Sequence, residues 1–150
     1  MLRLPGVLLL LCLAVGDFTQ AQVSLPPVPV APDINRVRLQ ASPDGRHLAR
    51  RDGRPFLWLG DTAWELLHHA SAEEIALYFK DRGEKRFTVS QIVLVPELNG
   101  LTRPNRYGDL PFLEGNPARP NTNWFDLARY AAGEAFSKGI YVAFLPTWGG

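Results

Sequence analysis

Two patterns of apolar and polar positions take turns along this chain: continuous apolar runs and segments with helical spacing. Three segments are mostly apolar without strict alternation, which is typical of strands buried on both faces: residues 55–59, 87–95 and 140–145. Two segments between them repeat apolar side chains at helical spacing: residues 72–85 and 124–138. Ser71 and Glu74 form a capping-box pattern at the start of the first helix, and Gly139 follows the second as a C-terminal stop. The order predicts an α/β fold with a parallel sheet.

A β-hairpin is expected before this sheet. Residues 37–40 and 46–50 read as short strands around Ser42-Pro43-Asp44-Gly45, which suits a type I turn. No glycine-rich phosphate loop follows Leu59, which argues against a dinucleotide or P-loop fold. An eight-stranded barrel needs about 250 residues. We therefore expect the first two and a half βα units of a (β/α)₈ TIM barrel, truncated at residue 150.

The amino-terminal segment has the features of a signal peptide. A positive residue, the apolar run 7–15 and small residues near Ala21 predict export to the periplasm or the exterior after cleavage of residues 1–21. The apolar run is too short to span a bilayer, so no membrane insertion is expected after signal removal. Residues 22–35 are proline-rich and predict a linker, which leaves 36–150 as the folded domain.

Composition narrows the classes of partner and cofactor. Sixteen basic and fifteen acidic residues give a net charge of +1 without any charge run, which argues against a nucleic-acid partner. The single cysteine, Cys12, leaves with the signal peptide, so thiolate metal sites and disulfides are excluded. His68 and His69 are neighbours on a short helical turn and point about 100° apart, so no metal site is expected. No cofactor is expected, and the sequence specifies no oligomeric state.

Candidate binding residues follow the predicted strands, where barrel enzymes carry their active sites. Carboxylates and amides beside indole rings suit a carbohydrate, and six residues are candidates for substrate binding: Asp61, Trp64, Glu97, Asn99, Tyr107 and Trp148. We expect Asp61, Glu97 and Trp148 to surround one hollow. Structural alternatives remain: Asp61 also suits a helix N-cap, Trp64 also suits core packing, and Asn99 also suits a turn.

Several separated motifs carry a family resemblance. They are Asp52-Gly53-Arg54-Pro55-Phe56-Leu57-Trp58-Leu59-Gly60-Asp61-Thr62-Ala63-Trp64, Phe87-Thr88-Val89, Glu97-Leu98-Asn99-Gly100, Arg103-Pro104-Asn105-Arg106-Tyr107-Gly108 and Leu145-Pro146-Thr147-Trp148-Gly149. In this order they resemble the apiosidase-like glycoside hydrolases, family 140, over residues 36–150. Gly83 inside the first helix and Ser90-Gln91 inside the second strand depart from the expected pattern.

The resemblance implies a carbohydrate substrate and a hydrolytic reaction. It implies a (β/α)₈ barrel, often followed by a small β-sandwich, that removes a sugar such as apiose from plant pectic side chains. It also implies that the paired catalytic carboxylates lie on later strands, beyond Gly150. Three alternatives stay open: a non-catalytic carbohydrate-binding protein on the same barrel, a cell-surface interaction module, and a truncated fragment without activity of its own.

Overall fold

The structure is a computed structural model that describes residues 24–29, 33, 37–95, 97 and 99–148. The predicted signal peptide, residues 1–21, lies outside the described residues. The elements follow in the order β1 (Leu39–Ala41), β2 (Leu48–Arg50), β3 (Gly60–Thr62), α2 (Leu66–His69), α3 (Ala72–Glu84), β4 (Val89–Val95), the 3₁₀ turn η1 (Leu113–Gly115), α4 (Thr122–Ser137) and β5 (Tyr141–Thr147).

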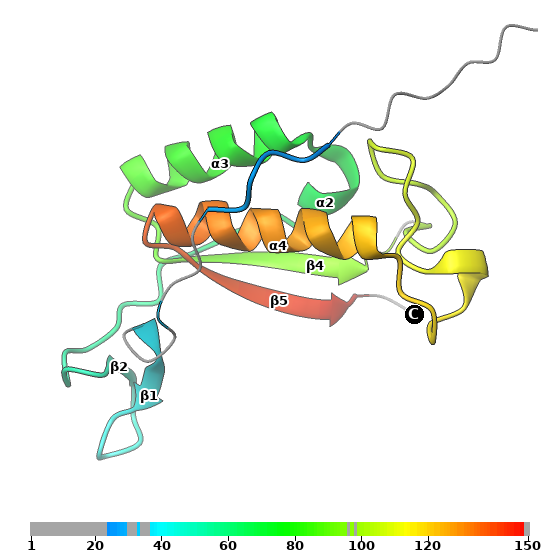
Figure 1. Ribbon diagram of the computed structural model, residues 1–150. Coiled ribbons are helices and arrows are strands. Elements are labelled where there is room, and N and C mark those ends of the chain that lie inside the picture. The colour runs from blue at the N-terminus through cyan, green and yellow to red at the C-terminus, as the bar shows by residue number, and fades with distance from the viewer. Residues whose placement is uncertain (1–23, 30–32, 34–36, 96, 98, 149–150) are drawn as a thin grey trace, which may run out of the picture.

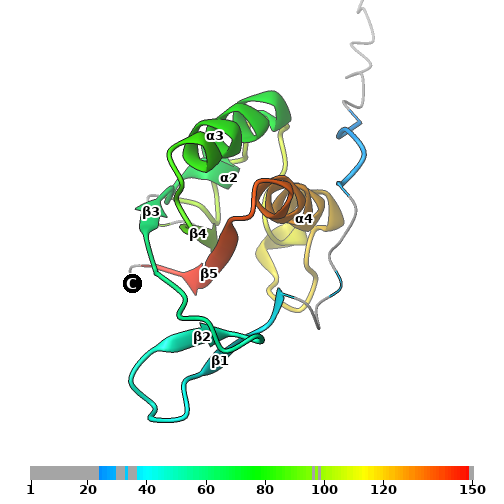
Figure 2. The same cartoon turned by 90° about the vertical axis from the view of Figure 1, so that its left-hand side faces the viewer.

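Three strands form a parallel sheet in the order β3-β4-β5. Helices α3 and α4 lie side by side over one face of this sheet (Figures 1 and 2). The α/β fold and the order of its elements are therefore confirmed, and the parallel strands with their covering helices form part of a barrel wall. The described strands do not close into a barrel.

A single apolar core lies between the sheet and the two helices. Its largest fully buried side chains include Phe79 of α3, Ile92 of β4, and Trp124 and Leu127 of α4. The Trp124 indole Nε1 donates a hydrogen bond of 2.8 Å to the Leu94 carbonyl, so its one polar atom is satisfied inside the core. Burial of this apolar surface is the main force that holds the helices against the sheet.

Helix α3 begins as predicted and packs closely at its other end. The Ser71 hydroxyl accepts from the Glu74 N–H, and the Glu74 carboxylate accepts from the Ser71 N–H at 2.7 Å, which confirms the capping box. Gly83 lies where a Cβ atom would come within 3.0 Å of the Lys138 Cβ, just past the end of α4. The glycine that interrupts the predicted helix therefore allows α3 and α4 to approach each other.

The predicted strand at residues 55–59 is wrong, because this apolar run joins the hairpin first. Pro55 forms an antiparallel bridge with Ala49, and the Phe56 N–H donates to the Leu48 carbonyl. Residues 57–59 are then exposed, and pairing with β4 starts only at Gly60. The first parallel strand is consequently three residues long and begins later than the sequence suggested.

Proline at position 146 does not end the last strand, contrary to expectation. Strand β5 runs through Pro146 to Thr147, which pairs with Val95. Proline lacks an N–H group, and it fits here because the register between β4 and β5 pairs Leu145 and Thr147 but skips Pro146.

The predicted hairpin is confirmed as the antiparallel pair β1 and β2. It lies at the amino-terminal end of the parallel strands, as Figure 1 shows. There the Tyr141 hydroxyl at the start of β5 donates a hydrogen bond to the Val37 carbonyl, and the Phe56 ring meets the Tyr141 ring edge-on at 5.1 Å. The hairpin and Phe56 therefore cover the amino-terminal end of the sheet.

Part of the predicted linker lies against α4. Val28 and Pro29 are so close to Gly133 that a Cβ atom there would meet a carbon of each at 3.0 Å. Leu25 also packs against the core. None of the helices in the described residues is both long and apolar enough to cross a membrane.

Candidate functional site

Two tryptophans meet at the carboxyl ends of the parallel strands. Trp64 follows β3 and Trp148 follows β5, and their ring centroids lie 5.1 Å apart at an interplanar angle of 51°. Both side chains are partly open to solvent, with exposed fractions of 37% for Trp64 and 48% for Trp148. The structure thus brings together two residues that the strand-end rule had selected, although a long stretch of chain separates them.

Asp61 does not lie with these tryptophans, so the expected hollow shared by Asp61, Glu97 and Trp148 does not form. Asp61 pairs with Ser90 near the start of β4 and faces the helices. Its Oδ2 atom accepts hydrogen bonds from the Tyr78 hydroxyl at 3.0 Å and from the Arg82 guanidinium at 2.9 Å. The physical reason is the late start of β3, which places Asp61 inside the strand and not beyond its end.

Tyr78 is the centre of this polar contact between the sheet and α3. Its hydroxyl also lies 2.9 Å from the Ser90 Oγ atom, which explains the serine inside a buried strand. Burial, together with the hydrogen bond to Asp61, raises the pKa of Tyr78 to about 12. Gln91, the second polar residue of β4, lies on the other face, with its Oε1 atom 3.5 Å from the Thr62 hydroxyl.

Glu97 and Asn99 lie in the turn that follows β4, and both are exposed. Asn99 has a φ angle of 74°, and its carbonyl accepts from the N–H groups of Thr102 and Arg103 at 2.9 and 2.7 Å. Asparagine is among the residues that adopt this left-handed conformation most readily. Asn99 therefore has the turn role that the sequence had offered as its alternative.

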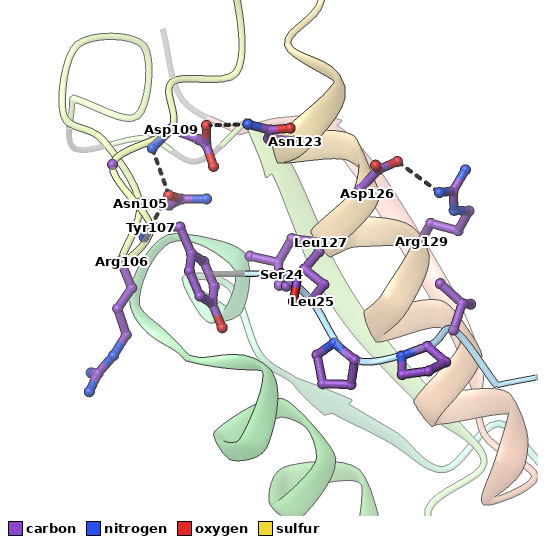
Figure 3. A pocket seen from close by; sticks show the side chains of 14 residues that line it. Ser24, Leu25, Asn105, Arg106, Tyr107, Asp109, Asn123, Asp126, Leu127 and Arg129 are labelled. Carbon is purple, nitrogen blue, oxygen red and sulfur yellow. Dashed lines mark hydrogen bonds and ion pairs between the residues drawn. The ribbon is translucent and has the colours of Figure 1, made fainter. Parts of the chain in front are cut away.

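Tyr107 fixes the long loop after β4 to the start of α3. Its hydroxyl accepts a hydrogen bond of 2.7 Å from the Ala72 N–H, one of the free donors at that helix end. The tyrosine also lines a cavity of about 1250 Å³ between residues 24–28, residues 105–109 and the first half of α4 (Figure 3). Tyr107 thus lies on the helix side of the sheet, away from the paired tryptophans.

This cavity is lined by polar pairs that are largely satisfied internally. Asp109 accepts from the Asn123 amide at 3.2 Å, and Arg129 pairs with Asp126 at 2.9 Å (Figure 3). Asn105 holds the loop by accepting from two backbone N–H groups, while its buried Nδ2 has no partner among the described residues. This cavity is therefore separate from the strand ends.

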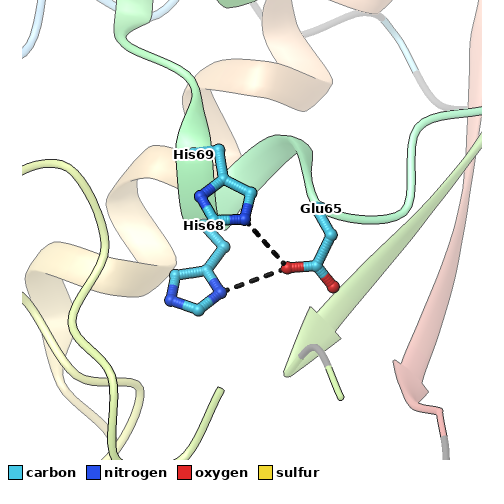
Figure 4. A group of neighbouring side chains, drawn as sticks. All are labelled: Glu65, His68 and His69. Atoms are coloured by element: carbon cyan, nitrogen blue, oxygen red, sulfur yellow. Dashed lines mark hydrogen bonds and ion pairs between the residues drawn. The ribbon is translucent and has the colours of Figure 1, made fainter. Parts of the chain in front are cut away.

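Sequence reasoning missed Glu65, and the expectation that His68 and His69 point apart is wrong, because their rings stack on each other. Glu65, His68 and His69 bring one carboxylate oxygen and two ring nitrogens within 4.8 Å of one another (Figure 4). His68 is buried and its ring stacks on His69, with centroids 4.7 Å apart and planes 9° from parallel. The signal available in the sequence was the spacing i, i+3, i+4, which places side chains on one helical face.

The chain was compared with protein families and known structures. The family model described as "Apiosidase-like, catalytic domain" matches residues 42–150. A search of curated proteins found no match.

Two solved structures share this fold. A glycoside hydrolase family 5 protein from Bacteroides vulgatus is 26% identical, with a TM-score of 0.66. A second structure, described as a glycoside hydrolase, is 26% identical with a TM-score of 0.67. Each match covers 77% of this chain but only 26% of the other, so the chain spans about a quarter of the length of these structures.

Proposed function

Because this chain belongs to the apiosidase-like catalytic domain family, we propose that the full-length protein hydrolyses glycosidic bonds in plant pectic carbohydrate. The substrate bond is the one that joins a sugar such as apiose to a pectic side chain. The glycoside hydrolases that share its fold support the reaction type. The observation that carries the proposal is the exposed pair Trp64 and Trp148 at the carboxyl ends of β3 and β5.

The tryptophan pair suits a sugar ring for a physical reason. Sugar rings have apolar C–H faces and hydroxyl edges, so an indole can pack against the face while polar groups bind the edge. Trp64 and Trp148 supply the apolar surface, and Glu97 and Asn99 follow β4, the strand that lies between β3 and β5. In a barrel of this type the carboxyl ends of the strands are where substrates bind.

The hydrolysis needs two carboxyl groups. One donates a proton to the leaving oxygen, and the other acts as a nucleophile or activates water. Asp61 is bound to Tyr78 and Arg82, and Glu65 is bound to two histidines. The family resemblance implies that the catalytic pair lies on strands that follow β5 in the full-length protein, and we propose that this chain supplies part of the substrate-binding wall.

The test measures sugar release from pectic polysaccharide by the full-length protein and by two variants. Trp148→Ala should lower kcat/KM by at least about tenfold, roughly 1.4 kcal/mol, because an exposed stacking surface is lost. Trp58→Ala is the matched control, since Trp58 is 49% exposed but precedes β3, at the other end of the sheet. It should retain most of the activity.

Three results would count against the proposal. Equal losses in the two variants would show that the tryptophan position is irrelevant, and the absence of both sugar release and sugar binding would favour an interaction module. Sugar binding without release would favour a carbohydrate-binding protein that lacks the catalytic pair.

We also propose that the protein is exported to the periplasm or the exterior. The support is the apolar run 7–15 with small residues near Ala21. Amino-terminal sequencing of the mature full-length protein should begin at Gln22, whereas an intact Met1 start on protein retained in the cytosol would contradict export.

A further inference from the structure

The short helix α2 and its N-cap residue, Glu65, place three possible metal-binding atoms on one side. Glu65 Oε2 lies 3.2 Å from His68 Nδ1 and 3.5 Å from His69 Nε2 (Figure 4). The three atoms lie within 4.8 Å of one another. Carboxylate oxygen and imidazole nitrogen are ligands that zinc and related divalent metals prefer.

His68 is held in an arrangement that a neutral imidazole does not satisfy alone. Its Nε2 lies 3.0 Å from the Arg103 carbonyl, and its Nδ1 lies 3.2 Å from the Glu65 carboxylate. Both neighbours are acceptors, but a neutral imidazole has only one N–H group. With the proton on Nε2 donated to the carbonyl, the Nδ1 lone pair faces a carboxylate lone pair. A positive species between these two atoms removes the repulsion.

We propose that Glu65, His68 and His69 bind a divalent transition-metal cation of the zinc type. Ligand atoms at 2.0–2.1 Å from a tetrahedral zinc ion lie roughly 3.3 Å apart. The two distances from Glu65 Oε2, 3.2 and 3.5 Å, match this spacing. His69 is 57% exposed, so its ring can rotate to bring the two nitrogens closer, and water can reach a fourth position.

The surroundings of His68 match those of a metal-binding histidine. Such a histidine commonly donates its second ring N–H to a backbone carbonyl, which fixes the ring orientation and the tautomer. Here that carbonyl belongs to Arg103, in the long loop after β4. The His68 side chain is only 2% exposed, and its ring lies against Trp124 at a centroid distance of 6.2 Å. One of the three ligands is therefore already positioned by the core.

The cation would connect two parts of the strand-end face. Glu65 directly follows Trp64, and His68 contacts the loop that begins after β4. A bound metal would hold α2 and this loop in a fixed relation beside the paired tryptophans. This role is independent of the proposed hydrolysis, because it does not require the metal to contact the substrate.

The rival explanation for the two acceptors around His68 is a second proton on its imidazole ring. A doubly protonated His68 donates to both acceptors and needs no metal. The two explanations differ in a measurable way, because a metal displaces the proton from the imidazole and its affinity falls as the pH falls.

The experiment titrates full-length protein, stripped with a chelator, with Zn²⁺ by calorimetry and with Co²⁺ by visible absorption. His69→Ala removes an exposed ligand and should leave the fold intact. His47→Ala is the matched control, because His47 is also exposed and lies near a single carboxylate, with Nδ1 3.9 Å from Asp44. Wild type and His47→Ala should bind Zn²⁺ equally, and His69→Ala should lose one site or bind it at least about tenfold more weakly.

A second variant keeps the test decisive if His69→Ala alters folding. Glu65→Gln removes the carboxylate ligand with little change of shape and should cause the same loss of Zn²⁺ affinity. If wild type binds no Zn²⁺, or if both variants bind it as wild type does, the site holds a shared proton only and the proposal is wrong.

Discussion

Arg82 on α3 donates a hydrogen bond of 2.9 Å to Asp61 in β3, and so joins the helix layer to the first parallel strand. Tyr78, one helical turn earlier, donates to the same carboxylate oxygen. The two charged side chains are each 25% exposed, so solvent screens their attraction only in part. The stability of the contact between α3 and β3 therefore depends on the negative charge of Asp61.

Asp61→Asn should destabilise the protein by about 1–2 kcal/mol, because Arg82 and Tyr78 would lose a charged acceptor. Urea unfolding of the full-length protein measures this change. Asp81→Asn is the control, since Asp81 pairs with the same arginine but is more exposed, at 39%. It should cost clearly less than Asp61→Asn, because solvent screens this more exposed pair. Equal costs would show that the contact with β3 contributes no more than a surface pair.

Alkaline pH should destabilise the fold through Tyr78. Its pKa is raised to about 12 in the folded protein, mainly by burial, from the 10.0 that is usual for a tyrosine. Between these values the unfolded chain loses the tyrosine proton while the folded chain keeps it. Unfolding is then favoured, so the free energy of unfolding falls as the pH rises from 10 to about 12. Urea midpoints measured across this range test the prediction.

Tyr78→Phe should reduce this alkaline decline but not abolish it. The pKa of Tyr130 is also raised to about 12, again mainly by burial, so a second tyrosine acts in the same direction. A variant whose stability declines with pH as steeply as wild type would show that Tyr78 titrates normally.

Gly83→Ala should destabilise the protein, although this substitution inside a helix usually stabilises it by about 0.5–1 kcal/mol. The added Cβ would lie 3.0 Å from the Lys138 Cβ. Crowding of this kind typically costs about 1–3 kcal/mol, so a net loss of roughly 1 kcal/mol is expected in thermal or urea unfolding.

Lys138→Gly tests whether crowding causes the loss in Gly83→Ala, because it removes the Cβ atom that the new alanine side chain would meet. The double variant should lose less stability than the sum of the two single changes. A stabilising Gly83→Ala with simple additivity would mean that α3 and α4 do not press together at this point.

The sequence predicted those elements whose signals are local. Strand β4 is a long apolar run, and α3 carries its own capping box, so neither depends on distant residues for recognition. Residues 55–59 look equally apolar but bind the hairpin, and only the backbone bonds of Pro55 and Phe56 reveal this. An apolar run indicates burial without specifying which strand it will join.

The candidate site also contains residues that local signals could place and residues that depend on distant parts of the chain. Trp64 and Trp148 could each be selected in advance, because parallel strands end at one edge, although core packing stayed open for Trp64. Asp61 could not be placed, since the shift in the start of β3 moved it from beyond the strand to within it. Glu65, His68 and His69 have a visible spacing, but their convergence depends on side-chain rotamers that a sequence does not specify.

Phe56 and the hairpin cover the amino-terminal end of the parallel sheet, so the two ends of the sheet differ in their access to solvent. Under the proposed function, a carbohydrate would approach from the opposite end, where Trp64 and Trp148 lie. Exposed residues at that end could then vary with the sugar without disturbing the contacts of Tyr141 that hold the hairpin in place. Substrate recognition and maintenance of the fold would thus be divided between opposite ends of the same strands.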